Sequence, residues 1–138
     1  MPIGTTSKNL EGEQLLEWAR EFVRDEWAKA WNDHDGETMS TFFADGGEYW
    51  DPTCGLVPKA GVPRMIADLT ALAPDHHFSV HPGTVTVMRT SPDSVNLVLR
   101  WTYVAGRGRL KLPGIDFLEI ENDEIVRAST YLCEKQAD

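Results

Sequence analysis

The chain has 138 residues, which suits one domain, and its apolar and charged fractions of 41% and 25% are ordinary for a globular protein. Its 13 basic residues against 22 acidic ones leave a net charge of −9. Binding to nucleic acid or to an anionic membrane depends on clustered lysine and arginine, so we expect neither as a partner.

The first part of the chain predicts helices. Residues 1–9 are small and polar and are expected to form a flexible tail, which leaves a single domain over residues 10–138. Over residues 11–32, apolar side chains recur every three or four positions, and this spacing predicts a helix with one buried stripe. Asp35 is a typical helix-capping residue, and a second, shorter helix is expected from there through Ala44.

A short strand is predicted over residues 48–51, where Pro52 stops it, and residues 53–60 are expected to form a loop. A third helix follows over residues 61–74, with Pro63 in its first turn.

The second half of the chain reads as strands separated by turn residues. They are expected over residues 76–81, 84–90, 94–105, 107–121 and 125–133, and the first two form one strand that bends at Pro82 and Gly83. Helices followed by an antiparallel meander predict an α+β fold, with three N-terminal helices packed on a curved, mostly antiparallel sheet.

Two carboxylates stand out in this pattern. Along residues 108–120, one face of the strand holds only apolar residues and glycine apart from Asp116, so burial is expected to raise the pKa of this carboxyl group. Asp116 then either donates a hydrogen bond as a neutral acid or pairs with a buried donor without any chemistry. Asp51 ends a strand beside Trp50, where it is either a general base or a residue that starts a turn before Pro52.

These residues carry a family resemblance that covers residues 15–134. Residues 42–52, the helix start at Gly61, residues 114–120 and residues 125–131 resemble the nuclear-transport-factor-2-like (NTF2-like) superfamily. The resemblance implies a cone-shaped α+β barrel and a homodimer formed through the outer face of the sheet, where Trp50 is expected to point. It also implies the roles of a ketosteroid isomerase, in which Asp51 is the proton-shuttling base and Asp116 the protonated aspartate that binds the enolate oxygen.

The sequence also departs from the ketosteroid isomerases. Trp27 stands where they have a tyrosine that binds the oxyanion, and an indole can donate one hydrogen bond but cannot act as an acid. Residues 74–78 and 100–102 look more like SnoaL-like proteins, in which proton transfer next to a carbonyl leads to ring closure. An epoxide hydrolase would need an aspartate two residues after Arg100, and residue 102 is threonine.

A hydrophobic substrate pocket is expected inside the cone. Its predicted walls come from the first and third helices and from the inward faces of the strands: Trp27, Trp31, Tyr49, Met65, Leu69, His77, Trp101, Tyr103 and Leu118. No metal site is expected, because four residues of strand separate His77 from His81 by about 13 Å. No phosphate-binding motif is present, so no nucleotide cofactor is expected.

The sequence therefore predicts a cofactor-independent acid–base enzyme, an isomerase, that acts on a hydrophobic polycyclic carbonyl compound. A SnoaL-like cyclase or dehydratase that uses the same carboxylates, and a ligand-binding domain without catalysis, remain as alternatives. Because the N-terminal residues lack an apolar segment, a cytoplasmic location with reduced Cys54 and Cys133 is expected.

Overall fold

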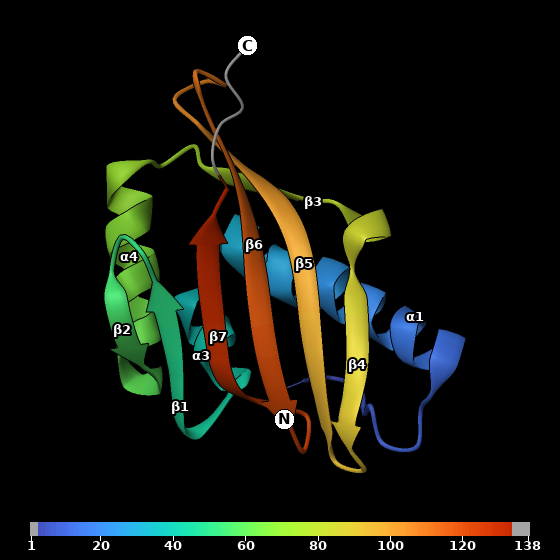
Figure 1. Ribbon diagram of the computed structural model, residues 1–138. Helices are drawn as coiled ribbons and strands as arrows, with labels where there is room; N and C mark the ends of the chain where they lie inside the picture. Colours follow the sequence, from blue (N-terminus) through green and yellow to red (C-terminus); the bar gives the residue numbers. More distant parts are fainter. Residues whose placement is uncertain (1–2, 134–138) are drawn as a thin grey trace.

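A long helical arm lies across one face of a curved sheet in the computed structural model, which describes residues 3–133 (Figure 1). The arm consists of α1 (Gly12–Phe22), the π-helical turn η1 (Val23–Trp27) and α2 (Ala28–Asn32). The predicted first helix is therefore confirmed, apart from the π-turn that interrupts it. Such turns change the phase of a helix and are frequent at functional sites, and here the turn ends at Trp27.

The segment before α1 is packed against the fold, so the predicted flexible tail is wrong for residues 3–9. Ile3 is only 1% exposed, and the Ser7 hydroxyl donates a hydrogen bond of 2.6 Å to Asp123. The guanidinium group of Arg89 donates to the carbonyl oxygens of Ser7 and Leu10. These partners lie about 80 to 115 positions away along the chain, which local composition cannot reveal. Residues 1–2 of the expected tail and residues 134–138 of the expected domain lie outside the described residues.

The second helix, α3 (Gly36–Thr41), begins as predicted, because the Asp35 carboxylate accepts a hydrogen bond of 3.0 Å from the backbone N–H of Thr38. It ends three residues before the predicted boundary at Ala44, since β1 (Phe43–Asp51) already begins at Phe43. After a turn, β2 (Gly55–Pro58) pairs antiparallel with β1 where a loop was expected. The 3-10 turn η2 (Lys59–Gly61) then leads into the predicted third helix, α4 (Val62–Leu72).

The remaining strands follow the predicted order. They are β3 (His77–Val80), β4 (Thr86–Ser91), β5 (Ser94–Ala105), β6 (Leu110–Glu121) and β7 (Glu124–Leu132). The expected bend at Pro82 and Gly83 is the 3-10 turn η3 (Pro82–Thr84) between β3 and β4. Asn122 and Asp123 both have positive φ, 50° and 57°, as the tight hairpin between β6 and β7 requires.

The sheet has the strand order β2-β1-β7-β6-β5-β3, and β4 also pairs with β5. The pair β1–β7 is parallel, and the other pairs are antiparallel. Helices on one face of a curved, mostly antiparallel and unclosed sheet confirm the predicted α+β cone. No helix among residues 3–133 combines the length and the apolar character that a membrane crossing requires, and the cytoplasmic location stays a prediction.

One close approach in the core requires a glycine. Gly114 on β6 lies opposite Trp101 on β5, and a Cβ atom at position 114 would come within 2.2 Å of the Trp101 indole. Such a contact is far inside the normal separation of carbon atoms. The indole of Trp101 therefore occupies the space over Gly114, where it lies beside Asp116.

Candidate active site

A cavity of about 220 Å³ opens between α4, the end of α2 and the inner face of the sheet. Its walls are mostly aromatic and aliphatic side chains: Trp31, Tyr49, Asp51, Thr53, Leu69, Leu72, Phe78, Trp101, Tyr103, Leu110, Leu112, Thr130 and Leu132. Three of these leucines, Leu72, Leu110 and Leu132, are also exposed to solvent and therefore stand at the mouth. They come from the ends of α4, β6 and β7 that lie in the upper part of Figure 1.

Asp51 lines this cavity at the end of β1. Its Oδ1 atom accepts hydrogen bonds from the backbone N–H groups of Thr53, at 2.7 Å, and Cys54, at 3.3 Å. The interpretation of Asp51 as the start of a turn is thus confirmed. Among residues 3–133, Oδ2 has no hydrogen-bond partner, so one oxygen holds the turn and the other is free to accept a proton.

Asp116 lies deeper, in the middle of β6, and is only 3% exposed. The Thr130 hydroxyl donates to its Oδ1 at 2.7 Å, and the indole N–H of Trp27 donates to its Oδ2 at 3.1 Å. Burial raises the pKa of Asp116 to about 6, and the charge of Asp51 adds to this, while the side-chain donors of Thr130, Trp101 and Trp27 lower it in part. Within the described residues, Asp116 is not one of the groups that line the cavity.

Between Asp116 and the cavity stand two hydroxyl groups. Tyr49 and Thr130 both line the cavity, and their oxygen atoms are 2.5 Å apart. Together with Asp116 they form a chain of three hydrogen-bonded groups that leads from the core to the cavity wall. The pKa of the Tyr49 hydroxyl is raised well above its ordinary value, first by burial and then by the charges of Asp116 and Asp51.

The predicted pocket residues divide into three groups. Trp31, Tyr49, Leu69, Trp101 and Tyr103 line the cavity. Trp27, Met65 and Leu118 do not, because they are buried in the core cluster; the indole N–H of Trp27 binds Asp116 and does not face a ligand. His77 is exposed on the opposite side of β3, since its neighbour Phe78 is the residue that faces inward.

Seven residues of the cavity wall are absent from the predicted set: Thr53, Leu72, Phe78, Leu110, Leu112, Thr130 and Leu132. Phe78 would be predicted to line the pocket only if the residues that alternate with His77 were assigned to the inner face of the strand. Leu72 is the last residue of α4, and the sequence does not show which apolar residues of that helix reach the pocket. Thr130 lies directly opposite Asp116 in the β6–β7 pairing, a register that the sequence pattern does not give.

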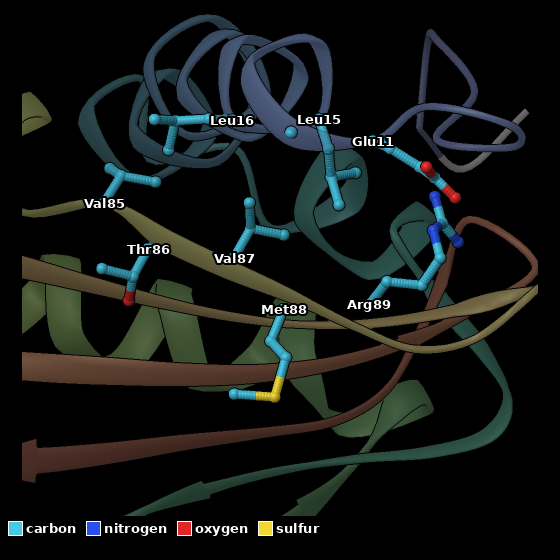
Figure 2. Close-up of a pocket in the computed structure, with 9 residues that line it drawn as sticks. Glu11, Leu15, Leu16, Val85, Thr86, Val87, Met88 and Arg89 are labelled. Atoms are coloured by element: carbon cyan, nitrogen blue, oxygen red, sulfur yellow. The ribbon is translucent and has the colours of Figure 1, made fainter.

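A second hollow, of about 590 Å³, lies between α1 and β4 (Figure 2). Figure 2 shows Val85 and Val87 turned toward the helix, whereas Thr86 and Met88 point to the other side of the strand. At one end lies Arg89, whose guanidinium holds the N-terminal segment. This hollow shares no residue with the cavity at Asp51, so it is not the candidate site.

No three His, Cys, Asp or Glu side chains within residues 3–133 gather closely enough to hold a metal ion. The polar groups of the cavity wall are instead one carboxylate, four hydroxyl groups and the indole N–H groups of Trp31 and Trp101. This set can accept a proton and donate hydrogen bonds to a ligand oxygen.

Comparison with known proteins fits this geometry. The family model of the SnoaL-like domain matches residues 24–128. The chain belongs to the SnoaL-like domain family. This membership, together with structural neighbours of ketosteroid isomerase-like fold, confirms the resemblance to the NTF2-like superfamily. The comparison with curated proteins finds no match.

Solved structures share the architecture of this SnoaL-like domain at low sequence identity. A candidate isomerase of the SnoaL-like family from Agrobacterium tumefaciens has 18% identity and a TM-score of 0.68, over 84% of this chain and 98% of that one. A candidate polyketide cyclase from Sinorhizobium meliloti has 13% identity and a TM-score of 0.64, over 79% and 93%. A hypothetical protein with a ketosteroid isomerase-like fold from Catenulispora acidiphila, crystallised with trimethylamine, has 19% identity and a TM-score of 0.60, over 79% and 83%. At these identities the similarity shows the fold.

Proposed function

We propose that this SnoaL-like domain is an acid–base enzyme that removes a proton from the carbon next to a carbonyl group. The observation that carries the proposal is the position of Asp51, the one carboxylate among the described residues on the wall of a mostly apolar cavity. A carboxylate with one free oxygen beside aromatic side chains is suited to take a proton from an apolar ligand.

The reaction needs no group beyond the side chains named. Asp51 takes the α-proton, the C–H electron pair forms the new C=C bond, and the carbonyl π-electrons move onto oxygen to give an enolate. Return of the proton to another carbon completes an isomerisation. Attack of the enolate carbon on a second carbonyl group of the same molecule, whose oxygen then takes the proton, completes a cyclisation.

The size of the cavity limits the substrate. An apolar cavity of about 150 Å³ holds one benzene ring, and this one measures about 220 Å³. We therefore infer a hydrophobic ketone whose reacting part has one or two fused rings, a narrower class than the polycyclic compounds expected from the sequence. Exposed leucines at the mouth leave room for a substituent to extend into solvent.

The proposal is tested with 2-tetralone, a two-ring ketone, by measuring exchange of its α-protons for deuterium with NMR. Exchange that saturates with ketone concentration and exceeds the buffer-catalysed rate is expected. A four-ring ketone of similar acidity, with its carbonyl group on an inner ring that cannot enter the cavity, serves as the control and is expected to exchange at the buffer rate. Saturable binding of 2-tetralone without exchange would contradict the proposal and favour the ligand-binding alternative.

We also propose that two copies of the chain associate through the outer face of the sheet, the side turned to the viewer in Figure 1. Apolar residues lie side by side there across five strands: Leu56, Trp50, Tyr131, Ile115, Phe117 and Val98. The same face carries acidic Glu48 and Glu119 in register with basic Arg127. A patch with both signs of charge beside an apolar centre can pair with its own copy about a two-fold axis.

Replacing Phe117 by Glu is expected to convert a dimer to a monomer, because an unpaired charge at the centre of an apolar interface costs several kcal/mol. Sedimentation equilibrium at micromolar concentration measures this. Thr41→Glu adds the same charge at an exposed position of α3 and is expected to leave the dimer intact. A wild-type protein that sediments as a monomer would refute the interface.

A further inference from the structure

The enolate of the proposed reaction needs a hydrogen-bond donor, and the buried carboxyl group of Asp116 does not reach the cavity wall. Both of its oxygens are already engaged, Oδ1 by Thr130 and Oδ2 by Trp27. Thr130 and Tyr49, which are linked to Asp116 by hydrogen bonds, do line the cavity, and so does Trp101, whose indole lies beside Asp116. An indole N–H can only donate, so the two hydroxyl groups are the partners whose hydrogen bonds can change direction with the proton on Asp116.

The position of the acid proton follows from the partners of Asp116. The indole N–H of Trp27 can only donate, so Oδ2 must accept in either protonation state. When Asp116 is neutral, its proton consequently sits on Oδ1 and points to the Thr130 hydroxyl. Thr130 then has one hydrogen left, which it donates to the Tyr49 oxygen at 2.5 Å. This leaves the hydrogen of Tyr49 free for a ligand in the cavity.

When Asp116 is ionised, every hydrogen bond in the chain reverses. Thr130 gives its hydrogen to the Asp116 carboxylate, and Tyr49 gives its hydrogen to Thr130. The Tyr49 hydroxyl then offers the cavity only lone pairs, which repel a carbonyl or enolate oxygen. The Tyr49 hydroxyl thus offers the cavity a hydrogen-bond donor when Asp116 is protonated and an acceptor when Asp116 is ionised.

We propose that the Tyr49 hydroxyl, and not the Asp116 carboxyl group, binds the substrate oxygen, and that Thr130 couples its donor direction to the proton on Asp116. The inference deepens the proposed function and rests on it for the identity of the oxygen. Tyr49 is then a catalytic residue, because it touches the substrate. Thr130 and Asp116 are positioning residues that act through it.

The surroundings contain few other groups that titrate. From β1 and the turn that follows, Asp51 and Cys54 face this chain of hydroxyl groups, and from β5 Tyr103 shares the cavity wall. The partners supplied by the helical arm and by β7, Trp27 and Thr130, are uncharged. Burial raises the pKa of Asp116 to about 6, so the donor form of Tyr49 is favoured below that pH.

Coumarin is a suitable probe, since this two-ring lactone has a carbonyl acceptor, no hydrogen-bond donor and no α-proton that Asp51 could remove. Naphthalene has two rings and no oxygen. Binding of each to the full chain is measured by quenching of tryptophan fluorescence at about pH 5.5 and about pH 8. We expect coumarin to bind about three- to tenfold more tightly at the lower pH, which is the value of one hydrogen bond, and naphthalene to bind equally at both.

Variants separate the three roles. Tyr49→Phe and Thr130→Val are each expected to remove the pH dependence of coumarin binding, and Thr130→Ser is expected to restore it because the hydroxyl group remains. Asp116→Asn carries a permanent N–H donor toward Thr130 and is expected to bind coumarin tightly at both pH values. Naphthalene binding, measured on every variant, shows that the cavity is intact.

Persistence of the pH dependence in Tyr49→Phe would overturn the proposal, as would a wild-type protein that shows no preference for coumarin at low pH. Coumarin cannot enolise, so this result is independent of catalysis. Failure of α-proton exchange in 2-tetralone would overturn the proposed function and leave the coumarin result standing. Exchange that is unaffected by Tyr49→Phe would overturn the assignment of Tyr49 as the group that binds the substrate oxygen, and would leave the proposed function standing.

Discussion

Asp51→Asn is expected to slow α-proton exchange in 2-tetralone by about 10²- to 10⁴-fold, the usual contribution of a positioned general base. The substitution removes the charge and little else. The amide oxygen of asparagine can still accept the hydrogen bonds from the backbone N–H groups of Thr53 and Cys54, so the turn after β1 is retained. The free Oδ2 becomes an NH₂ group, which cannot take a proton.

A matched control comes from the same strand. Asp45 lies in β1, but its side chain is fully exposed, and it contacts Lys59 at 3.5 Å. Asp45→Asn is therefore expected to exchange at the wild-type rate. NMR measures the exchange, and thermal unfolding of both variants shows whether the fold is kept. An Asp51→Asn rate within a factor of two of wild type would refute the assignment of Asp51 as the base.

The alternation of side chains along β6 explains why Asp116 could be found from the sequence. In an antiparallel strand with one buried face, a single charged residue in the apolar row must be buried, whatever its neighbours are. The structure agrees, with Gly114, Asp116, Leu118 and Ile120 all buried. The fold class followed in the same way, because the order of helices and strands does not depend on which strands pair.

The partners of Asp116 could not be found by that argument. Thr130 faces it because the β6–β7 hairpin sets one register and contains an irregularity between Glu119 and Ile120. Trp27 reaches it from the π-turn that interrupts the helical arm. Both depend on geometry that a period of 2 or 3.6 residues does not encode.

His77 shows the opposite outcome. The segment Asp75–Val80 contains two adjacent histidines followed by Phe78, and its strand has only four residues. In so short a strand one position decides the whole alternation, and a shift by one residue exchanges the two faces. The large aromatic ring of Phe78 takes the inner position, where it packs against Trp31 and Trp101. His77 is left on the outside.

Asp116→Asn is expected to make the protein more stable above about pH 7, although it removes a buried functional group. The pKa of Asp116 is about 6 in the folded chain, against an ordinary value of 3.8 for an aspartate in water, so the folded state binds the proton more tightly than the unfolded state. The free energy of unfolding therefore falls as pH rises from about 4 to about 6, and stays low above it. At about 1.36 kcal/mol per pKa unit, the ionised carboxylate costs about 3 kcal/mol at neutral pH.

Asparagine reproduces the neutral form of the side chain. Its oxygen can accept from Trp27 and its NH₂ group can donate to Thr130, so both hydrogen bonds are retained without a charge to bury. Denaturant unfolding from about pH 3 to about pH 8 is expected to give curves for variant and wild type that converge below about pH 4. At high pH the two are expected to separate by about 3 kcal/mol.

Asp68→Asn, at an exposed position of α4, is the control and is expected to follow the wild-type curve throughout. Parallel curves for Asp116→Asn and wild type would mean that Asp116 titrates alike in the folded and unfolded chains. A carboxyl group that costs this much stability at neutral pH contributes nothing to the fold that asparagine would not. Its presence is explained if Asp116 must gain and lose its proton, because the coupling through Thr130 makes the hydrogen-bond direction of Tyr49 follow that proton.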